Sequence, residues 1–139
     1  MDNISYHGTN AKNANSIVGP PSNIKLSIGK GELGKGFYTG SSLSLAVSWA
    51  FTRYESDAHI VELNIEIDEF IKLKPLVLDK IDNVLKVWKN SKDKKINQKY
   101  DYIVAPFVTI RELGKQFKFE SHKSEVTINK SGLKKYPCV

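Results

Sequence analysis

Two aromatic residues next to glycines are the side chains of this chain whose types and spacing could do chemistry. His7 lies in Tyr6-His7-Gly8-Thr9, and Tyr38 lies in Gly34-Lys35-Gly36-Phe37-Tyr38-Thr39-Gly40. A histidine and a tyrosine at the ends of two strands can form a slot for a flat heteroaromatic ring. Nicotinamide is such a ring, so the pair indicates a nicotinamide slot.

The hydrophobic pattern predicts the elements that must position these two rings. Residues 4–7 are a predicted strand, and residues 10–18 a helix that Thr9 or Asn10 caps and that the Gly-Pro-Pro-Ser run at 19–22 ends. Residues 23–36, rich in glycine and lysine, predict an exposed loop that can close over a ligand. Residues 37–39 are a strand with Phe37 facing the core, and Ser41 or Ser42 caps the amphipathic helix that follows.

The second half of the chain is predicted to hold more strands than helices. Residues 59–67 alternate between apolar and polar and predict a strand with one face on the core. Leu78, Ile81, Leu85 and Trp88 follow helical spacing, and residues 89–99 read as a basic surface loop. Strands are predicted over residues 100–107, 116–121 and 125–129. We therefore expect one α+β domain over residues 1–139, with a mostly antiparallel, split sheet.

One glycine motif does not fit its usual function. Gly29, Gly31 and Gly34 spell the dinucleotide-binding pattern GxGxxG. That pattern needs a preceding strand and a following helix whose N-terminus holds the pyrophosphate. Here a predicted strand follows, so these glycines are interpreted as turn residues.

The composition of the chain limits the functional classes and the kinds of site that remain open. The chain has 139 residues and a net charge of +6, carried almost wholly by lysine, since Arg53 and Arg111 are its arginines. Lysine attracts phosphate-rich partners but lacks the two-pronged guanidinium with which arginine reads bases, and a solvated lysine surface is an equal alternative.

The single cysteine, Cys138, excludes an intrachain disulfide and a cysteine-histidine metal cluster. His59 and His122 lack partners at metal-ligand spacing. No apolar run is long enough to span a membrane, and no signal segment is evident, so we expect a soluble, complete chain without membrane contact.

The two aromatic motifs resemble the His-Tyr-Glu class of the ADP-ribosyltransferase superfamily, which contains diphtheria toxin and the poly(ADP-ribose) polymerases. The polymerases show a His-Gly-Ser segment and then a Gly-Lys-Gly-aromatic-Tyr strand followed by a helix of small residues. Here His7-Gly8-Thr9 and Gly34-Lys35-Gly36-Phe37-Tyr38 stand in the same order, followed by residues 41–50. The arrangement also looks like small bacterial and phage members of the class. The resemblance covers the first third of the chain.

The resemblance implies a fold of split antiparallel sheets with flanking helices, and NAD as the substrate without a metal. It implies that Gly8 pairs with the carboxamide, that His7 donates to the adenosine-side ribose, and that Tyr38 stacks on nicotinamide. The cofactor-binding residues that it implies are His7, Gly8, Thr9, Gly36, Phe37, Tyr38 and Ser41.

The resemblance also implies a catalytic glutamate at the opening of a late strand, where negative charge stabilises the oxocarbenium-like ribose. Glu125, followed by Val-Thr-Ile, fits this pattern and joins His7 and Tyr38 as the predicted catalytic set. Glu120 and Glu112 are its competitors, and Glu120 is the candidate on the acceptor side. Glu120 and Glu125 are five residues apart, which departs from the Glu-x-Glu pattern and puts arginine in doubt as the acceptor.

The predicted activity is a mono-ADP-ribosyltransferase acting in the cytoplasm, or in a host cytoplasm, as a toxin, effector or phage-related protein. A protein acceptor is favoured over RNA or DNA, which stay open, and a cognate antitoxin or immunity protein is a further expected partner. The alternatives are an NAD glycohydrolase without a macromolecular acceptor and a basic nucleic-acid-binding domain. The related RNA 2′-phosphotransferases are disfavoured because the chain lacks their phosphate-gripping arginines.

Overall fold

The computed structural model describes residues 3–27, 29, 31, 33–90, 100–107 and 114–138 of the chain. Its helices are α1 (Ala11–Val18), α2 (Leu43–Tyr54), α3 (Ile67–Phe70), α4 (Ile81–Asn90) and α5 (His122–Asn129), with the 3-10 turn η1 (Glu55–Asp57) after α2. Its strands are β1 (Ile4–Asn10), β2 (Phe37–Gly40), β3 (Ala58–Asn64), β4 (Pro75–Val77), β5 (Tyr102–Pro106), β6 (Lys115–Phe119) and β7 (Gly132–Pro137). The protein is therefore of the α+β class.

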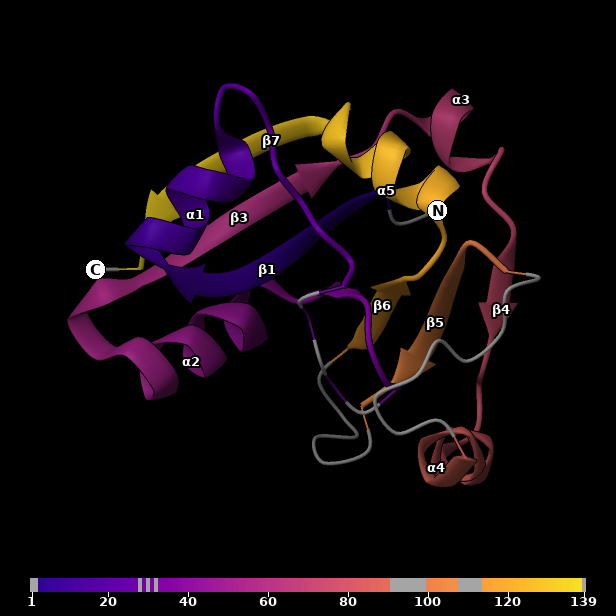
Figure 1. Cartoon of the computed structure of the whole chain (residues 1–139). Coiled ribbons are helices and arrows are strands. Elements are labelled where there is room, and N and C mark those ends of the chain that lie inside the picture. The colour runs from indigo at the N-terminus through magenta and orange to yellow at the C-terminus, as the bar shows by residue number, and fades with distance from the viewer. Residues whose placement is uncertain are drawn as a thin grey trace.

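The strands form one seven-stranded sheet in the order β4-β5-β6-β2-β1-β3-β7. Within it β4 and β5 run parallel, and the other described pairs are antiparallel. The two halves of the sheet meet at β1 and β2, where Tyr6 lies opposite Gly40. Figure 1 shows β1, β3 and β7 in one half of the sheet and β6, β5 and β4 in the other.

Helices cover both faces of the sheet. On one face, Ala14 and Ile17 of α1 and Ile128 of α5 join the largest buried cluster, which also contains Phe37, Val61, Leu63, Phe117 and Phe119. On the other face, Ala50 of α2 packs on Ala58 and Ile60 of β3, and Val84 of α4 packs with Ile103 and Ala105 of β5. In Figure 1, α1 and α5 accordingly lie on one side of the strands and α2 and α4 on the other.

Side-chain caps set the starts of three helices. Asn10, Ser42 and Ser121 each accept a hydrogen bond from the backbone N–H three residues later, which satisfies a donor that the first helical turn leaves open. Gly19 ends α1 with φ at +72°, a conformation that side chains disfavour. These local signals agree with the predicted starts of α1 and α2.

The structure differs from the predictions at several elements. Residues 125–129 are not a strand: Ser121 forms a capping box with Ser124, and the helix α5 covers them. Strand β3 ends at Asn64, and its residues Ile60 and Val61 are both buried, so both faces of this strand are covered. In the segment predicted to be an exposed loop, Ile24, Leu26 and Leu33 are buried. Strands β4 and β7 were not predicted from the sequence, because β4 has only three residues and the sequence of β7 is polar and basic. The predicted basic loop lies largely outside the described residues.

Candidate functional site

A cavity of about 280 Å³ lies where the two halves of the sheet separate. Its wall combines strand residues, the start of α2 and glycines from the segment before β2. The lining residues are Tyr6, His7, Gly8, Gly29, Gly31, Gly36, Phe37, Tyr38, Thr39, Gly40, Ser42, Leu45, Ala46, Trp49, Phe107 and Gln116. The aromatic rings and glycine backbones among them suit a flat, largely apolar group with a few polar atoms.

His7 is held in one tautomer. Its Nδ1 lies 2.7 Å from the carbonyl oxygen of Tyr38, and because a carbonyl only accepts, Nδ1 carries the proton. Its ring stacks on Phe37 with the centroids 4.5 Å apart. Burial lowers the pKa of His7, outweighing the opposite effect of the hydrogen bond to Tyr38. The neutral ring therefore offers its Nε2 as an acceptor, whereas the resemblance implied that His7 donates to a ribose.

Tyr38 uses its hydroxyl to hold the segment that precedes it. The hydroxyl donates to the carbonyl oxygen of Gly34 and accepts the N–H of Leu33 at 3.0 Å. A Cβ on Gly31 would lie 2.6 Å from Cζ of Tyr38, so the backbone at Gly31 lies directly against this ring. Tyr38 thus lines the cavity and also folds the glycine segment over it.

Gly8 is a glycine because of helix α2. A Cβ at this position would meet the carbonyl oxygen of Ala46 at 2.8 Å and the Cβ of Ala50 at 3.0 Å. The close approach brings Trp49 to the cavity wall, where its ring is half exposed. Arg53 lies over this ring at 5.1 Å, and Tyr54 meets it edge-on. The absent side chain of Gly8 therefore serves helix packing, and the cavity gains a second aromatic wall.

Gln116 is a lining residue that the sequence analysis did not single out. It is buried near the start of β6, directly opposite Gly40 of β2 and Ala105 of β5. Its Nε2 donates to the carbonyl oxygen of Pro106 at 3.2 Å. The available signal was a polar residue opening the strand predicted for residues 116–121, but the facing glycine on β2 is evident only from the strand register.

Five of the predicted cofactor-binding residues line the cavity: His7, Gly8, Gly36, Phe37 and Tyr38. Thr9 is buried, lies opposite His59 of β3 and is not among the lining residues. Ser41 lies beside the lining residue Ser42, and its hydroxyl accepts the N–H of Lys115 at 2.9 Å. Thr9 and Ser41 are therefore outside the lining set.

Of the predicted glutamates, the two that the structure describes, Glu120 and Glu125, are not among the lining residues of the cavity. Glu125 lies on α5, and Ile128 of this helix packs on the sheet face opposite to Gln116. The Oε2 of Glu125 accepts the N–H of Leu26 at 3.2 Å. Glu120 is buried at the end of β6, 3.4 Å from the ammonium of Lys118. Glu112 lies outside the described residues. Because α5 replaces the predicted strand, the alternation that favoured Glu125 has no structural counterpart.

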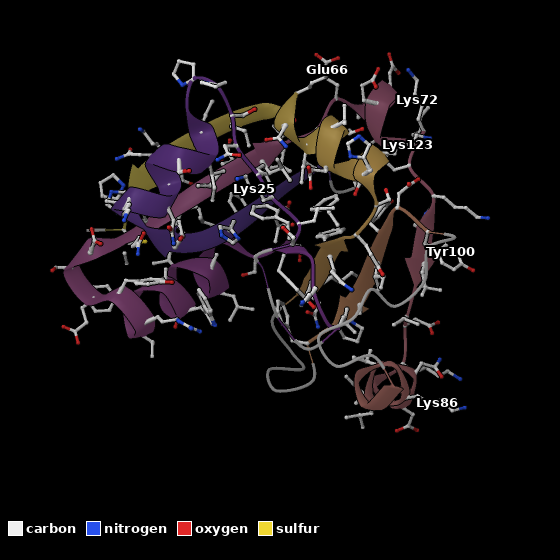
Figure 2. All side chains as sticks on the ribbon, in the orientation of Figure 1. Lys25, Glu66, Lys72, Lys86, Tyr100 and Lys123 are labelled. Atoms are coloured by element: carbon white, nitrogen blue, oxygen red, sulfur yellow. The ribbon has the colours of Figure 1, made fainter. Side chains whose placement is uncertain are left out.

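Charge is absent from the described wall of the cavity and gathers elsewhere. No Asp, Glu, Lys or Arg is among the described lining residues. The same part of the chain contains no group of three His, Cys, Asp or Glu side chains that could hold a metal ion. Figure 2 shows Lys86 on α4, and Lys72 and Lys123 near α3 and α5, all of them away from α2. The cavity thus suits a group bound by shape, stacking and neutral hydrogen bonds.

Comparison with known proteins adds no family. No family model matches the chain, and a search of curated proteins finds no significant match. Among the described helices, none has the length and apolar character needed to cross a membrane. The functional conclusion therefore depends on the cavity and its residues.

Proposed function

We propose that this chain binds NAD in the central cavity and is a mono-ADP-ribosyltransferase with an ADP-ribosyltransferase-like split sheet. One observation carries the proposal: three adjacent strands, β1, β2 and β6, contribute His7, Tyr38 and Gln116 to the lining of the same cavity, which also has aromatic walls. The resemblance of the His-Gly-Thr and Gly-Lys-Gly-Phe-Tyr motifs to that superfamily supports the same interpretation.

The nicotinamide ring lies between the aromatic walls that Tyr38 and Trp49 provide, where stacking adds about 0.5–1.5 kcal/mol beyond burial. The Nε2 of neutral His7 accepts a hydrogen bond from a ribose hydroxyl. An amide oxygen has two lone pairs, so Oε1 of Gln116 can accept from a ligand hydroxyl in addition to protein donors. Gln116 then occupies the role that the resemblance gives to a glutamate near the start of a late strand.

Transfer breaks the bond between nicotinamide and C1′ of the ribose, and the bonding electrons leave with nicotinamide. The acceptor's nucleophile forms the new bond to C1′ and loses a proton. Positive charge develops on the ribose in the transition state, and a preorganised dipole stabilises it less than a carboxylate does. A site with Gln116 is therefore expected to turn over slowly.

A second candidate is NAD binding without appreciable cleavage. The observation that favours it is the lack of an acidic side chain among the described residues of the cavity wall. Hydrolysis of NAD to free ADP-ribose is the third candidate, because water can replace the macromolecular acceptor. The two cleavage reactions differ in whether ADP-ribose becomes attached to a macromolecule.

The test is a calorimetric titration with NAD, followed by measurement of nicotinamide release with and without cell lysate. We expect binding, slow release alone, and faster release with lysate. Release that lysate does not accelerate would favour hydrolysis, and binding without release would favour the second candidate. Absence of binding would refute the proposal.

Gln116 variants sharpen this test. Gln116→Glu introduces a carboxylate next to the ribose and is expected to speed nicotinamide release by about tenfold or more. It also loses the donor to Pro106, which costs about 1 kcal/mol of stability. Gln116→Ala should weaken NAD binding, and Lys115→Ala, at the exposed neighbouring position, is the matched control.

A further inference from the structure

A buried lysine lies behind one wall of the cavity. Lys118 is fully buried in β6, directly opposite Tyr38 of β2 on one side and Ile103 of β5 on the other. Both neighbours belong to or pack against an apolar cluster with Leu33 and Val84. An apolar side chain is the ordinary occupant of such a position, so the charge calls for a reason.

The ammonium of Lys118 holds the glycine-rich wall, by which we mean Gly29, Gly31, Leu33, Gly34 and Gly36. Its Nζ donates to the carbonyl oxygen of Leu33 at 2.8 Å. Its stem lies against the same wall, because a Cβ on Gly36 would be 2.7 Å from Cε and 2.8 Å from Cγ of Lys118. The lysine therefore fixes the wall by a charged hydrogen bond and by packing.

Tyr38 holds the other polar group of the same residue. Its hydroxyl accepts the N–H of Leu33, whose carbonyl oxygen Lys118 binds, so both backbone polar groups of Leu33 are held by side chains from two neighbouring strands. The wall closes on itself through Gly34 N–H to Gly31 O and Gly36 N–H to Gly29 O, each at 3.1 Å. Three of these glycines, Gly29, Gly31 and Gly36, line the cavity.

A buried ion pair is weak evidence for a gain in stability. The charge of Lys118 is balanced by Glu120 at 3.4 Å, but desolvating two charges often cancels their attraction, and apolar residues of similar size commonly do as well. What an apolar residue cannot do is bind the carbonyl oxygen of Leu33. A lysine at this position is therefore explained by the hydrogen bond that it makes to the glycine-rich wall.

We propose that Lys118 is a positioning residue that, together with the hydroxyl of Tyr38, keeps the glycine-rich wall in its ligand-binding arrangement. We call the hydrogen bond from Lys118 to Leu33, with the packing of the lysine stem on Gly36, the clamp. The naming of NAD as the ligand rests on the proposed function, whereas the clamp does not. The five residues of the wall gain order from the clamp, which lowers the entropy cost of closing around a ligand.

The test compares Lys118→Met/Glu120→Gln, which removes the clamp without leaving a lone buried charge, with the wild type and with Lys118→Met alone. Lys115→Met, at an exposed position of the same strand, is the matched control. Amide hydrogen exchange by NMR is measured at Leu33, Gly34 and Gly36, and at Ile60 and Val61 of β3 as a reference. The affinity for NAD is measured by calorimetry.

In the double variant we expect exchange at the three wall amides to rise about tenfold while β3 is unchanged, and the Kd for NAD to rise about tenfold. Unchanged wall exchange, or an equal rise in β3, would overturn the clamp, because the latter marks a loss of global stability. Loosening of the wall with unaltered NAD affinity would overturn its link to the ligand. If the wild type does not bind NAD, the proposed function fails and the exchange data still decide the clamp.

Discussion

At the scale of single residues, the cavity is built from side chains that have a structural partner as well as a place in the wall. His7 is fixed by Tyr38, Tyr38 by the backbone of Leu33 and Gly34, and Gln116 by Pro106. Such contacts lock the orientation of each polar group before a ligand arrives. Preorganisation of this kind reduces the cost of binding and of charge development.

The pH dependence of stability tests the buried state of His7. Its folded pKa lies below the ordinary value of 6.5, so below pH 6.5 the unfolded chain binds a proton that the folded chain does not. The contribution of His7 to stability is therefore complete above about pH 6.5 and falls as the pH drops toward the folded pKa. In His7→Asn, whose amide can still donate to Tyr38, the loss of unfolding free energy between pH 7 and pH 5 should be smaller than in the wild type. Identical losses in urea titrations of both proteins would contradict this.

The hydroxyl of Tyr38 is expected to matter as well as its ring. Stacking alone predicts that Tyr38→Phe is nearly neutral, but the structure shows that this hydroxyl donates one hydrogen bond to the glycine-rich wall and accepts another from it. We expect Tyr38→Phe to lower the free energy of unfolding by about 1–2 kcal/mol and to weaken NAD binding. Urea titration and calorimetry measure the two effects. Tyr100→Phe, outside the cavity, is the control, and a neutral Tyr38→Phe would leave stacking as the sole role.

At the scale of elements, helix α5 changes the meaning of the late part of the chain. The side chains of Glu125 and Asn129 on this helix bind the backbone of Leu26 and Ile24, and so fasten the start of the connection between α1 and β2. The end of the same connection is fastened by Tyr38 and Lys118. The connection is thus tied to both faces of the sheet.

Glu125 is accordingly expected to act as an anchor. Glu125→Gln keeps an oxygen that can accept the N–H of Leu26, so nicotinamide release should stay within about twofold of the wild type. Glu125→Ala removes the acceptor and should cost about 1 kcal/mol in a urea titration. A loss of about a hundredfold in turnover for Glu125→Gln would restore the catalytic role predicted from the sequence.

At the scale of the whole molecule, the net charge of +6 is not concentrated at the cavity. Lys115, Lys118 and Lys123 flank the predicted late strands, where they could form a basic surface, but Lys118 is buried and holds the glycine-rich wall. Lys115 and Lys123 remain exposed, and Lys123 donates to the carbonyl oxygen of Lys72. One lysine fewer is therefore available to bind a polyanionic acceptor.

We expect protein to be the acceptor in preference to nucleic acid. Labelling of a cell lysate with tagged NAD, followed by division into protease-treated and nuclease-treated fractions, should give label that protease removes and nuclease does not. Label removed by nuclease, with a steep fall of labelling as salt is raised, would instead indicate RNA or DNA bound through lysine–phosphate contacts.

The sequence by itself determined the elements around the first two motifs. Strand β1, helix α1, strand β2 and helix α2 follow from local patterns, because alternation, capping and glycine-proline breaks act over a few residues. The sequence left two candidates for each helix cap, and the structure selects Asn10 and Ser42. The α+β class, the antiparallel pairing and the burial of Phe37 follow from the same patterns. That His7 and Tyr38 are neighbours, as the hydrogen bond from His7 to the carbonyl oxygen of Tyr38 shows, was expected from the pair of motifs and their resemblance, because local patterns do not pair distant strands.

Only the tertiary structure decided which residue of the late strands faces the cavity. Residues 125–129 alternate as a strand would, but the Ser121 cap and the packing of Ile128 make them helical. Gln116 gains its place from a register in which it lies opposite Gly40, a pairing across 76 positions that no local pattern encodes. Lys118 reads as a surface charge until the same register places it opposite Tyr38, with Leu33 as its partner. The pairing of distant strands determines where Gln116 and Lys118 lie, because the environment of a strand residue depends on the residues packed around it on the neighbouring strands.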